Sequence, residues 1–251
     1  MFTVEALVVG AVAAFVVGLS KTGLPGGALI ATPLLATVLD GRLIAGGTLP
    51  ILLVADLFAV GWYRRHARWD VLRPLAVWIA VGYVLGVTFF VAVGSASGTI
   101  EVTIGTIVLA IVGLQFFRMW RGIVASGATP TLAATHGTTG GFTTFVANAA
   151  GPVINTYLIR LGLPKHDLIG TSAWLYFIIN LSKIPLYLAV GAWSTGGAFF
   201  TGEVLLYDLA VVPAVLLGAF GGRALFHHIP QRLFATVVLT LSGLGAINLL
   251  L

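Results

Sequence analysis

Apolar residues run along the chain in long stretches that are separated by short polar connectors. A helix that crosses a lipid bilayer needs about 20 apolar residues. Six stretches of 19 to 24 residues reach this length without interruption, and each predicts one membrane-spanning helix: 43–63, 71–93, 99–117, 168–191, 204–222 and 233–251.

Two further apolar stretches, 3–39 and 131–163, are longer than one span and are interrupted near the middle. The interruptions, at 20–27 and 147–152, each contain glycine and proline. Proline removes an intrahelical hydrogen bond and glycine lowers helix stability, so each break either unwinds a helix or turns a helical hairpin. These stretches either cross the bilayer twice or re-enter and return, which gives about eight to ten membrane segments in all.

The composition agrees with a membrane protein over the whole length. Of the 251 residues, 59% are hydrophobic and 8% are charged, whereas a soluble domain has about a quarter charged residues. A water-facing surface cannot be built from this composition, and intrinsic disorder is excluded for the same reason. We predict an all-α polytopic membrane protein in which residues 1–251 form one transmembrane domain.

Basic residues predict the orientation, because connectors in the cytoplasm are enriched in lysine and arginine. The formal net charge is +5, and the basic residues lie mostly between apolar runs. Membrane topology therefore explains the excess of basic residues, and no nucleic-acid partner is expected. Four basic connectors are predicted to be cytoplasmic: 64–73, 118–130, 160–167 and 223–232. Connectors 94–98 and 192–202 contain no basic residue and are predicted to be external, together with both termini in the cell membrane. Arg42, beside Asp40, is the exception, since it falls on the external side.

The two halves of the chain, 1–120 and 130–251, have the same layout of one interrupted segment followed by three spans. Matching connectors have opposite charge bias, because 64–73 is rich in arginine whereas 192–202 has no charge. Opposite bias in equivalent connectors is typical of an inverted-topology repeat, in which paired interrupted helices form a binding site near the middle of the membrane. The alternative is that the glycines and prolines only allow close helix packing.

Two lysines occur at positions where a charge inside the membrane is energetically unfavourable. Lys21 lies at the first break, and Lys183 lies inside the 168–191 span. A lysine near the centre of a membrane helix costs about 2.5–3.5 kcal/mol on insertion scales, so such residues are candidates for function. The polar positions around Lys183 recur at helical spacing and predict one face that points into the bundle: Tyr176, Asn180, Lys183 and Tyr187. We expect Asn180 and Lys183 to line a substrate path.

Other polar groups at the breaks suit an anion. The backbone amides at 22–27, which include Thr22, are freed where the helix unwinds, and a half-helix directs its positive end at such a break. The glycines let a ligand approach the backbone closely: Gly23, Gly26 and Gly27. Asn148 can donate two hydrogen bonds to an anion or can cap a helix.

Three further titratable residues are of interest. Asp56 is buried in the 43–63 span, where it either forms an ion pair with Lys21 or Lys183 or carries a coupling proton. Asp208 lies near the outer end of its span and is expected at the interface. His136 can titrate near neutrality, but a single histidine is more often structural.

Enzyme signatures are lacking. The chain has no cysteine, which excludes disulfides, thiol chemistry and cysteine metal sites. It also lacks the H-E-x-x-H and G-x-S-x-G motifs, a Walker-type phosphate loop and a close pair of acids within a span. We therefore expect no enzyme activity, no catalytic residues, no cofactor and no metal.

The two breaks resemble the paired signatures of the TauE/SafE sulfite exporter family. The residues that carry the resemblance are Gly18-Leu19-Ser20-Lys21-Thr22-Gly23-Leu24-Pro25-Gly26-Gly27 with Thr32-Pro33-Leu34-Leu35, and Thr143-Thr144-Phe145-Val146-Ala147-Asn148-Ala149-Ala150-Gly151-Pro152 with Gly162-Leu163-Pro164-Lys165. Asn180, Lys183 and Pro185 also look like that family, and the similarity runs from about residue 8 to residue 250. The resemblance implies a ligand role for the signature positions Lys21, Gly23, Gly26, Gly27, Asn148 and Gly151.

Together these features predict a transporter that exports a small anion by alternating access between two inverted repeats. Because no nucleotide site exists, coupling to the proton gradient is expected. The resemblance implies sulfite or a small organosulfur anion such as sulfoacetate as the substrate. An anion channel is the main alternative, and an accessory membrane subunit or an intramembrane enzyme is a further one. The partners are then the anion and the lipid bilayer, with self-association left open.

The charge pattern makes a direct prediction about topology. Single cysteines introduced at Ala67 and Thr195 should react with an impermeant thiol reagent from opposite sides of the membrane, the first from the cytoplasm and the second from outside. The cysteine-free parent is the control. Labelling of both positions from one side would contradict the inverted repeat.

Overall fold

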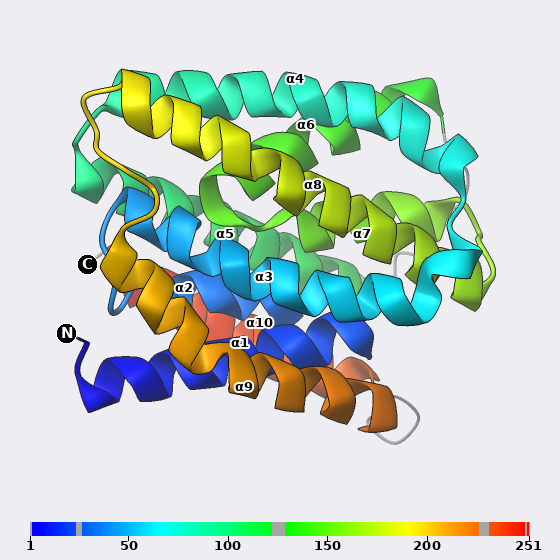
Figure 1. The fold of residues 1–251 in the computed structure, drawn as a ribbon. Coiled ribbons are helices and arrows are strands. Elements are labelled where there is room, and N and C mark those ends of the chain that lie inside the picture. Colours follow the sequence, from blue (N-terminus) through cyan, green and yellow to red (C-terminus); the bar gives the residue numbers. More distant parts are fainter. Residues whose placement is uncertain (1, 24–26, 122–128, 226–230, 249, 251) are drawn as a thin grey trace.

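The computed structural model describes residues 2–23, 27–121, 129–225, 231–248 and 250, and these residues form a bundle of helices (Figure 1). The described residues contain ten α-helices and two short 3₁₀ helices, with no strand. In chain order these are α1 Val4–Thr22, η1 Gly27–Ile30, α2 Ala31–Leu35, α3 Arg42–Tyr63, η2 Arg64–His66, α4 Trp69–Val93, α5 Ser97–Arg121, α6 Pro130–Ala147, α7 Ala150–Arg160, α8 Lys165–Trp193, α9 Gly202–Leu225 and α10 Gln231–Asn248.

The predicted all-α membrane architecture is confirmed. Helices α3, α4, α5, α8, α9 and α10 cover the six uninterrupted apolar stretches. Within the described residues, six helices are long and apolar enough to cross a membrane: α1, α3, α4, α5, α8 and α9. The protein is therefore a multi-pass membrane protein.

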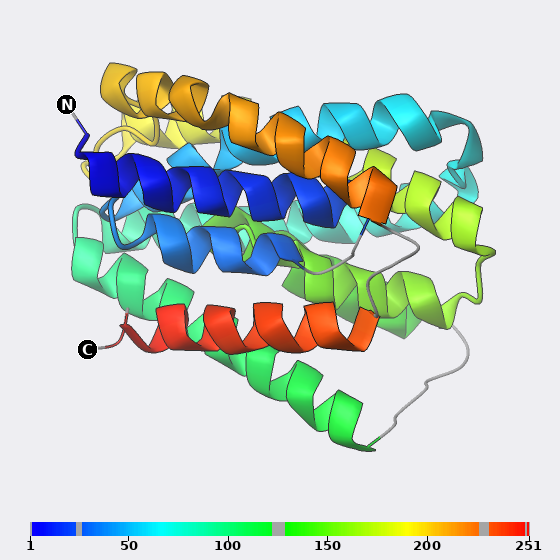
Figure 2. The same cartoon turned by 90° about the horizontal axis from the view of Figure 1, so that it is seen from below.

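Both interrupted stretches are helical hairpins, and the two hairpins enter the bundle from opposite ends (Figures 1 and 2). The first consists of α1 with the shorter return arm η1 and α2, and it starts and finishes at the end of the bundle where the chain termini lie. The second consists of α6 and α7, and it starts and finishes at the other end. An 18- or 19-residue arm is about 27–28 Å long, so each longer arm nearly spans a bilayer core.

The long arm of each hairpin packs against a helix of the other half of the chain. α1 runs along α9, and α6 runs along α4. Glycines allow the backbones to touch, as they commonly do between membrane helices. A Cβ atom placed on Gly18 would lie 2.2 Å from the carbonyl oxygen of Val215, and one placed on Gly218 would lie 2.0 Å from that of Phe15.

The same contacts recur between α6 and α4. A Cβ atom on Gly141 would lie 2.4 Å from the carbonyl oxygen of Ile79, and one on Gly82 would lie 2.3 Å from that of Thr138. Gly141 and Thr138 each follow their counterparts in α1 by 123 residues. The two hairpins are therefore held by matching backbone contacts.

Arg42 closes the bundle at the end formed by residues 36–41, 94–96 and 194–201. Its side chain, which the sequence placed on the external side, is buried and only 3% exposed. The guanidinium donates to Ser194 Oγ at 2.5 Å and to the carbonyl oxygen of Phe90 at 2.5 Å. The burial is tolerated because these acceptors replace water. This end of the bundle is thus tied together by one buried cation.

Buried aromatic rings lie directly beneath Arg42. Its guanidinium carbon is 5.3 Å from the centre of the Phe199 ring. Phe199 stacks on Tyr187 at 4.3 Å between ring centres, and Phe90 meets Phe199 edge-on at 4.8 Å. These side chains are buried and pack together beneath Arg42.

Asp208 is also more buried than the sequence suggested. The expectation of an interfacial position is wrong, because the residue is 3% exposed on α9, where it packs beside Gly47 of α3. Among the described residues, neither carboxylate oxygen has a hydrogen-bond partner. Burial follows from the close packing of α9 on α1 and α3, which a hydropathy pattern does not report.

The glycine contacts predict where added volume is not tolerated. Gly218→Ala and Gly82→Ala each place a methyl group within 2.3 Å of a backbone oxygen, so helices must separate at a cost of about 1–3 kcal/mol or more. Gly113→Ala is the matched control, because no atom lies within 4 Å of its Cβ position on α5. Thermal unfolding of detergent-purified protein should show lower midpoints for the first two variants alone. Equal midpoints for all three would contradict the packing.

Candidate functional site

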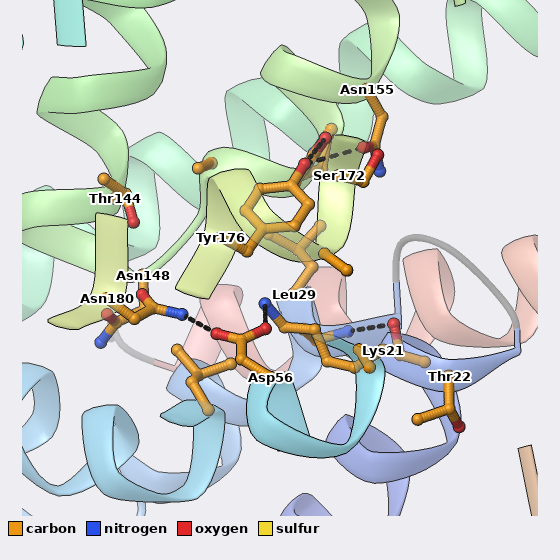
Figure 3. A pocket seen from close by; sticks show the side chains of 18 of the residues that line it. Lys21, Thr22, Leu29, Asp56, Thr144, Asn148, Asn155, Ser172, Tyr176 and Asn180 are labelled. Carbon is orange, nitrogen blue, oxygen red and sulfur yellow. Dashed lines mark hydrogen bonds and ion pairs between the residues drawn. The ribbon is translucent and has the colours of Figure 1, made fainter. Parts of the chain in front are cut away.

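A cavity of about 140 Å³ lies between the two hairpin breaks (Figure 3). Its volume is sufficient for several water molecules or a small anion. Helices α1, α3, α6, α7 and α8 contribute side chains to its wall. The polar lining residues are Ser20, Lys21, Thr22, Asp56, Thr144, Asn148, Asn155, Ser172, Tyr176 and Asn180.

The cavity lies toward the end of the bundle that is opposite Arg42. Ile159 and Leu168 line it, and these residues flank the connector at 161–164. That connector belongs to the end predicted to be cytoplasmic. The cavity is thus separated from the other end by the Arg42 contacts and the aromatic cluster.

Lys21 forms an ion pair across the cavity wall with Asp56. The Nζ atom of Lys21 is 2.8 Å from Asp56 Oδ1, and the Nδ2 atom of Asn180 donates to Asp56 Oδ2 at 2.6 Å. Asp56 is fully buried, whereas the Lys21 side chain is 11% exposed. The sequence left the partner of Asp56 open between two lysines, and among the described residues the ion pair is with Lys21.

Tyr176 holds the other side of the lysine. The Nζ atom of Lys21 lies 4.3 Å from the centre of the Tyr176 ring, a cation–π geometry. The Tyr176 hydroxyl donates to Asn155 Oδ1 at 2.7 Å. The ammonium group is therefore held between a carboxylate and an aromatic face at the edge of the cavity (Figure 3).

Asn148 ends α6 and turns the chain. Its backbone has φ 52° and ψ 28°, a left-handed conformation that asparagine adopts more readily than most residues. Its Nδ2 atom donates to the carbonyl oxygen of Ala45 at 3.0 Å, and its Oδ1 atom accepts from Lys183 Nζ. The side chain that was predicted either to bind an anion or to cap a helix is thus engaged in ties to α3 and α8.

Lys183 lies behind Asn148 and does not line the cavity wall. It is fully buried and donates to the carbonyl oxygen of Thr144 at 3.2 Å as well as to Asn148. One helical turn further along α8, the Tyr187 hydroxyl donates to the carbonyl oxygen of Phe145 at 2.5 Å. The predicted polar face of α8 does point into the bundle, and its inner part satisfies carbonyl groups freed at the end of α6.

The start of α7 faces the cavity. Ala150 and Gly151 lie on the wall, and the first-turn N–H groups of a helix have no intrahelical acceptor. The N-terminus of a helix also carries partial positive charge. A Cβ atom on Gly151 would meet nothing within 4 Å, so this position opens onto free space.

The first break is more closed than the sequence suggested. The Gly23 amide donates to the carbonyl oxygen of Leu19 at 3.1 Å, and a Cβ on Gly23 would lie 2.2 Å from the carbonyl oxygen of Gly222. Thr22 donates its hydroxyl to the carbonyl oxygen of Ala219 at 2.7 Å. Thr22 and Gly23 line the cavity, but the Thr22 hydroxyl is bonded to α9 and the Gly23 amide is bonded within α1. Only the backbone of Gly27 is described, at the start of η1, and Gly26 lies outside the described residues.

Five polar residues of the wall were not among the predicted site residues. Tyr176 was predicted only as part of the polar face of α8, and the others are Ser20, Thr144, Asn155 and Ser172. Three of these lie one helical turn from residues that were predicted, since Thr144 precedes Asn148, Asn155 follows Gly151 and Ser172 precedes Tyr176, each by four positions. An extension of each polar face by one turn could have found them.

The formal charges at the cavity favour an anion. Lys21 and Asp56 lie on the cavity wall and Lys183 lies behind Asn148, so one positive charge is in excess when all three are ionised. Asp56 offsets Lys21 at contact distance, whereas Lys183 has only uncharged acceptors among its described hydrogen-bond partners. The remaining charge acts together with the N-terminus of α7.

A comparison with known protein families identifies the chain. The sequence model described as "Sulfite exporter TauE/SafE" matches residues 7–249, nearly the whole length. The protein belongs to the TauE/SafE sulfite exporter family. No curated protein and no solved structure gave a significant match. As a TauE/SafE protein with membrane-spanning helices, the chain is a membrane transporter, which is not an enzyme class.

The Lys21–Asp56 pair predicts a measurable coupling in stability. Lys21→Met leaves a fully buried carboxylate without its cation, and we expect a loss of about 3–5 kcal/mol in the free energy of unfolding. The double variant Lys21→Met/Asp56→Asn should recover most of that loss, because the asparagine can still bond Asn180. Unfolding of purified protein in detergent measures both. Additive effects of the two substitutions would show that the ion pair does not exist.

Proposed function

We propose that the cavity binds a small oxyanion, namely sulfite or a small organosulfur anion such as sulfoacetate, and that the protein exports it. The observation that carries this proposal is the convergence on one cavity of Lys21 and the N-terminus of α7, each contributed by a different hairpin. An oxyanion accepts several hydrogen bonds at once, which suits an ammonium group beside a helix N-terminus. Lys183 adds charge from behind Asn148, and Asn180 positions Asp56.

We also propose that residues 1–120 and 130–251 are inverted repeats that move relative to one another in alternating access. The matching glycine contacts of α1 with α9 and of α6 with α4 support this, as do hairpins that enter from opposite ends. The described conformation corresponds to the inward-facing state, with Arg42 and the aromatic cluster as the external seal. Export requires these external contacts to separate once the anion is bound.

Asp56 provides a way to link a proton to the anion. Its carboxylate competes with an incoming anion for Lys21, because both are attracted to the same ammonium group. Protonation of Asp56 would remove this competition and release Lys21 to the ligand. Proton and anion occupancy of the site are then coupled.

Flux measurements in liposomes test the function. Purified protein should move sulfite or sulfoacetate with saturable kinetics and in preference to chloride, while an internal pH indicator reports proton movement. Accumulation against an anion gradient would identify a coupled transporter. Non-saturable flux that only follows the gradient would identify an anion channel, and an absence of flux for all tested anions would contradict the proposal.

Gly151 offers a blocking variant that does not disturb packing. Gly151→Val places its side chain in the free space beside α7, so we expect a folded protein with flux reduced about tenfold or more, because the anion loses contact with the helix N-terminus. Gly113→Val on the outer face of α5 is the matched control and should transport normally. Unchanged flux in Gly151→Val would place the substrate elsewhere.

A further inference from the structure

A second cavity, of about 170 Å³, lies between α5, α6 and α7. Pro152 lines both this cavity and the first one, so the first turn of α7 separates them. No role in the proposed transport step has been given to the second cavity. Its walls are partly apolar, and its polar part contains Arg118 and His136 beside the neutral residues Gln115, Thr135 and Thr139.

Two basic side chains, Arg118 and His136, line this cavity. A third, Arg160, lies on α7 four residues after Thr156, which is about 6 Å along the helix from the residue that Arg118 contacts. Arg118 donates from Nη1 to Thr156 Oγ1 at 2.8 Å. The Nε atom of Arg160 is buried and has no acceptor among the described residues. Several guanidinium N–H groups therefore remain for a ligand.

His136 is oriented by its own helix. Its Nδ1 atom donates to the carbonyl oxygen of Leu132 at 2.9 Å, because a carbonyl oxygen can only accept. The other ring nitrogen, Nε2, is left for a partner in the cavity. In the protonated ring this nitrogen becomes a donor and adds a third positive charge.

The cationic groups are not balanced by acids. Within the described part of the chain, neither Arg118 nor Arg160 forms an ion pair with a carboxylate. Like charges repel one another more strongly when they are partly removed from water, so a bound anion would lower the electrostatic energy of these groups. An anion with several oxygens fits, since arginine binds such groups with paired hydrogen bonds.

The apolar part of the cavity indicates which kind of anion binds there. Leu114 and Ile111 line it one and two helical turns before Arg118, about 6 and 10 Å along α5. Leu114 is 47% exposed on the outer face of a membrane-spanning helix, so the cavity opens to the lipid. A charged group at Arg118 that continues into an apolar chain along α5 has the shape of a phospholipid.

We propose that this cavity is a binding site for an acidic phospholipid, with its phosphate at Arg118 and Arg160 and an acyl chain along Leu114 and Ile111. Arg118 lies near the end of α5 that is predicted to be cytoplasmic, so the lipid belongs to the inner leaflet. The bond from Arg118 to Thr156 ties the site to α7. A bound lipid therefore braces the helix whose first turn faces the transport cavity.

Thermal unfolding of detergent-purified protein tests the site, with dioleoylphosphatidylglycerol added to the micelles. We expect the unfolding midpoint to rise with this lipid and to rise much less with dioleoylphosphatidylcholine. Arg118→Gln/Arg160→Gln should weaken the apparent affinity for the acidic lipid by about tenfold or more. Arg121→Gln is the matched control, because it removes the same charge from the same helix outside the cavity lining.

Two further arms decide between the lipid and a free anion. Leu114→Trp fills the apolar part of the cavity without removing a charge. It should also abolish the rise in the unfolding midpoint caused by the acidic lipid. This variant still tests the site if the double arginine variant does not fold. Inorganic phosphate at the same concentration should have little effect. An equal rise with phosphate would identify a soluble oxyanion site, and an equal loss in Arg121→Gln would identify unspecific charge attraction. Either result would overturn the proposal.

Discussion

The whole arrangement depends on one constraint, namely that a backbone group freed by a helix break cannot find water inside a membrane. Such a group costs several kcal/mol if it is left unpaired. At the end of α6, three carbonyl oxygens accept from side chains of other helices: Lys183 bonds that of Thr144, Tyr187 that of Phe145 and Thr32 that of Ala147. The end of α6 is therefore stabilised by α2 and α8.

This requirement also connects the two halves of the chain. Thr32 lies in the first hairpin and bonds the end of the second, while Asn148 of the second bonds Ala45 of α3. Within the first half, Tyr63 of α3 donates to the carbonyl oxygen of Thr22 at the first break, at 3.1 Å. The groups that make the breaks tolerable are thus the same groups that fix the cavity between them. Any relative movement of the halves must exchange these bonds for others.

The sequence was sufficient for the helices and breaks, because these depend on local hydropathy and on glycine and proline. It also predicted the polar face of α8. It could not assign the partner of Asp56, nor place Lys183 behind Asn148, because these depend on which helices touch. The burial of Arg42 and Asp208 could not be predicted for the same reason: their distance from a span end says nothing of the helix packed over them. The glycines signalled close approach but not the partner, since apolar helices in lipid have no hydrophobic preference for one another.

The helix-packing contacts recur in both halves of the chain, whereas the charged residues of the cavity do not. The contact positions of α1 recur in α6 123 residues later, yet the same shift places Thr144 at the position of Lys21 and Val60 at that of Lys183. The proposed repeats are thus alike where they pack and unlike where they carry charge. A symmetric scaffold allows two conformations of similar energy, because the same backbone contacts can form at either end of the bundle. In the proposed alternating access, one charged centre at the interface would serve both conformations, because its ligand can remain in place while access changes from one side to the other.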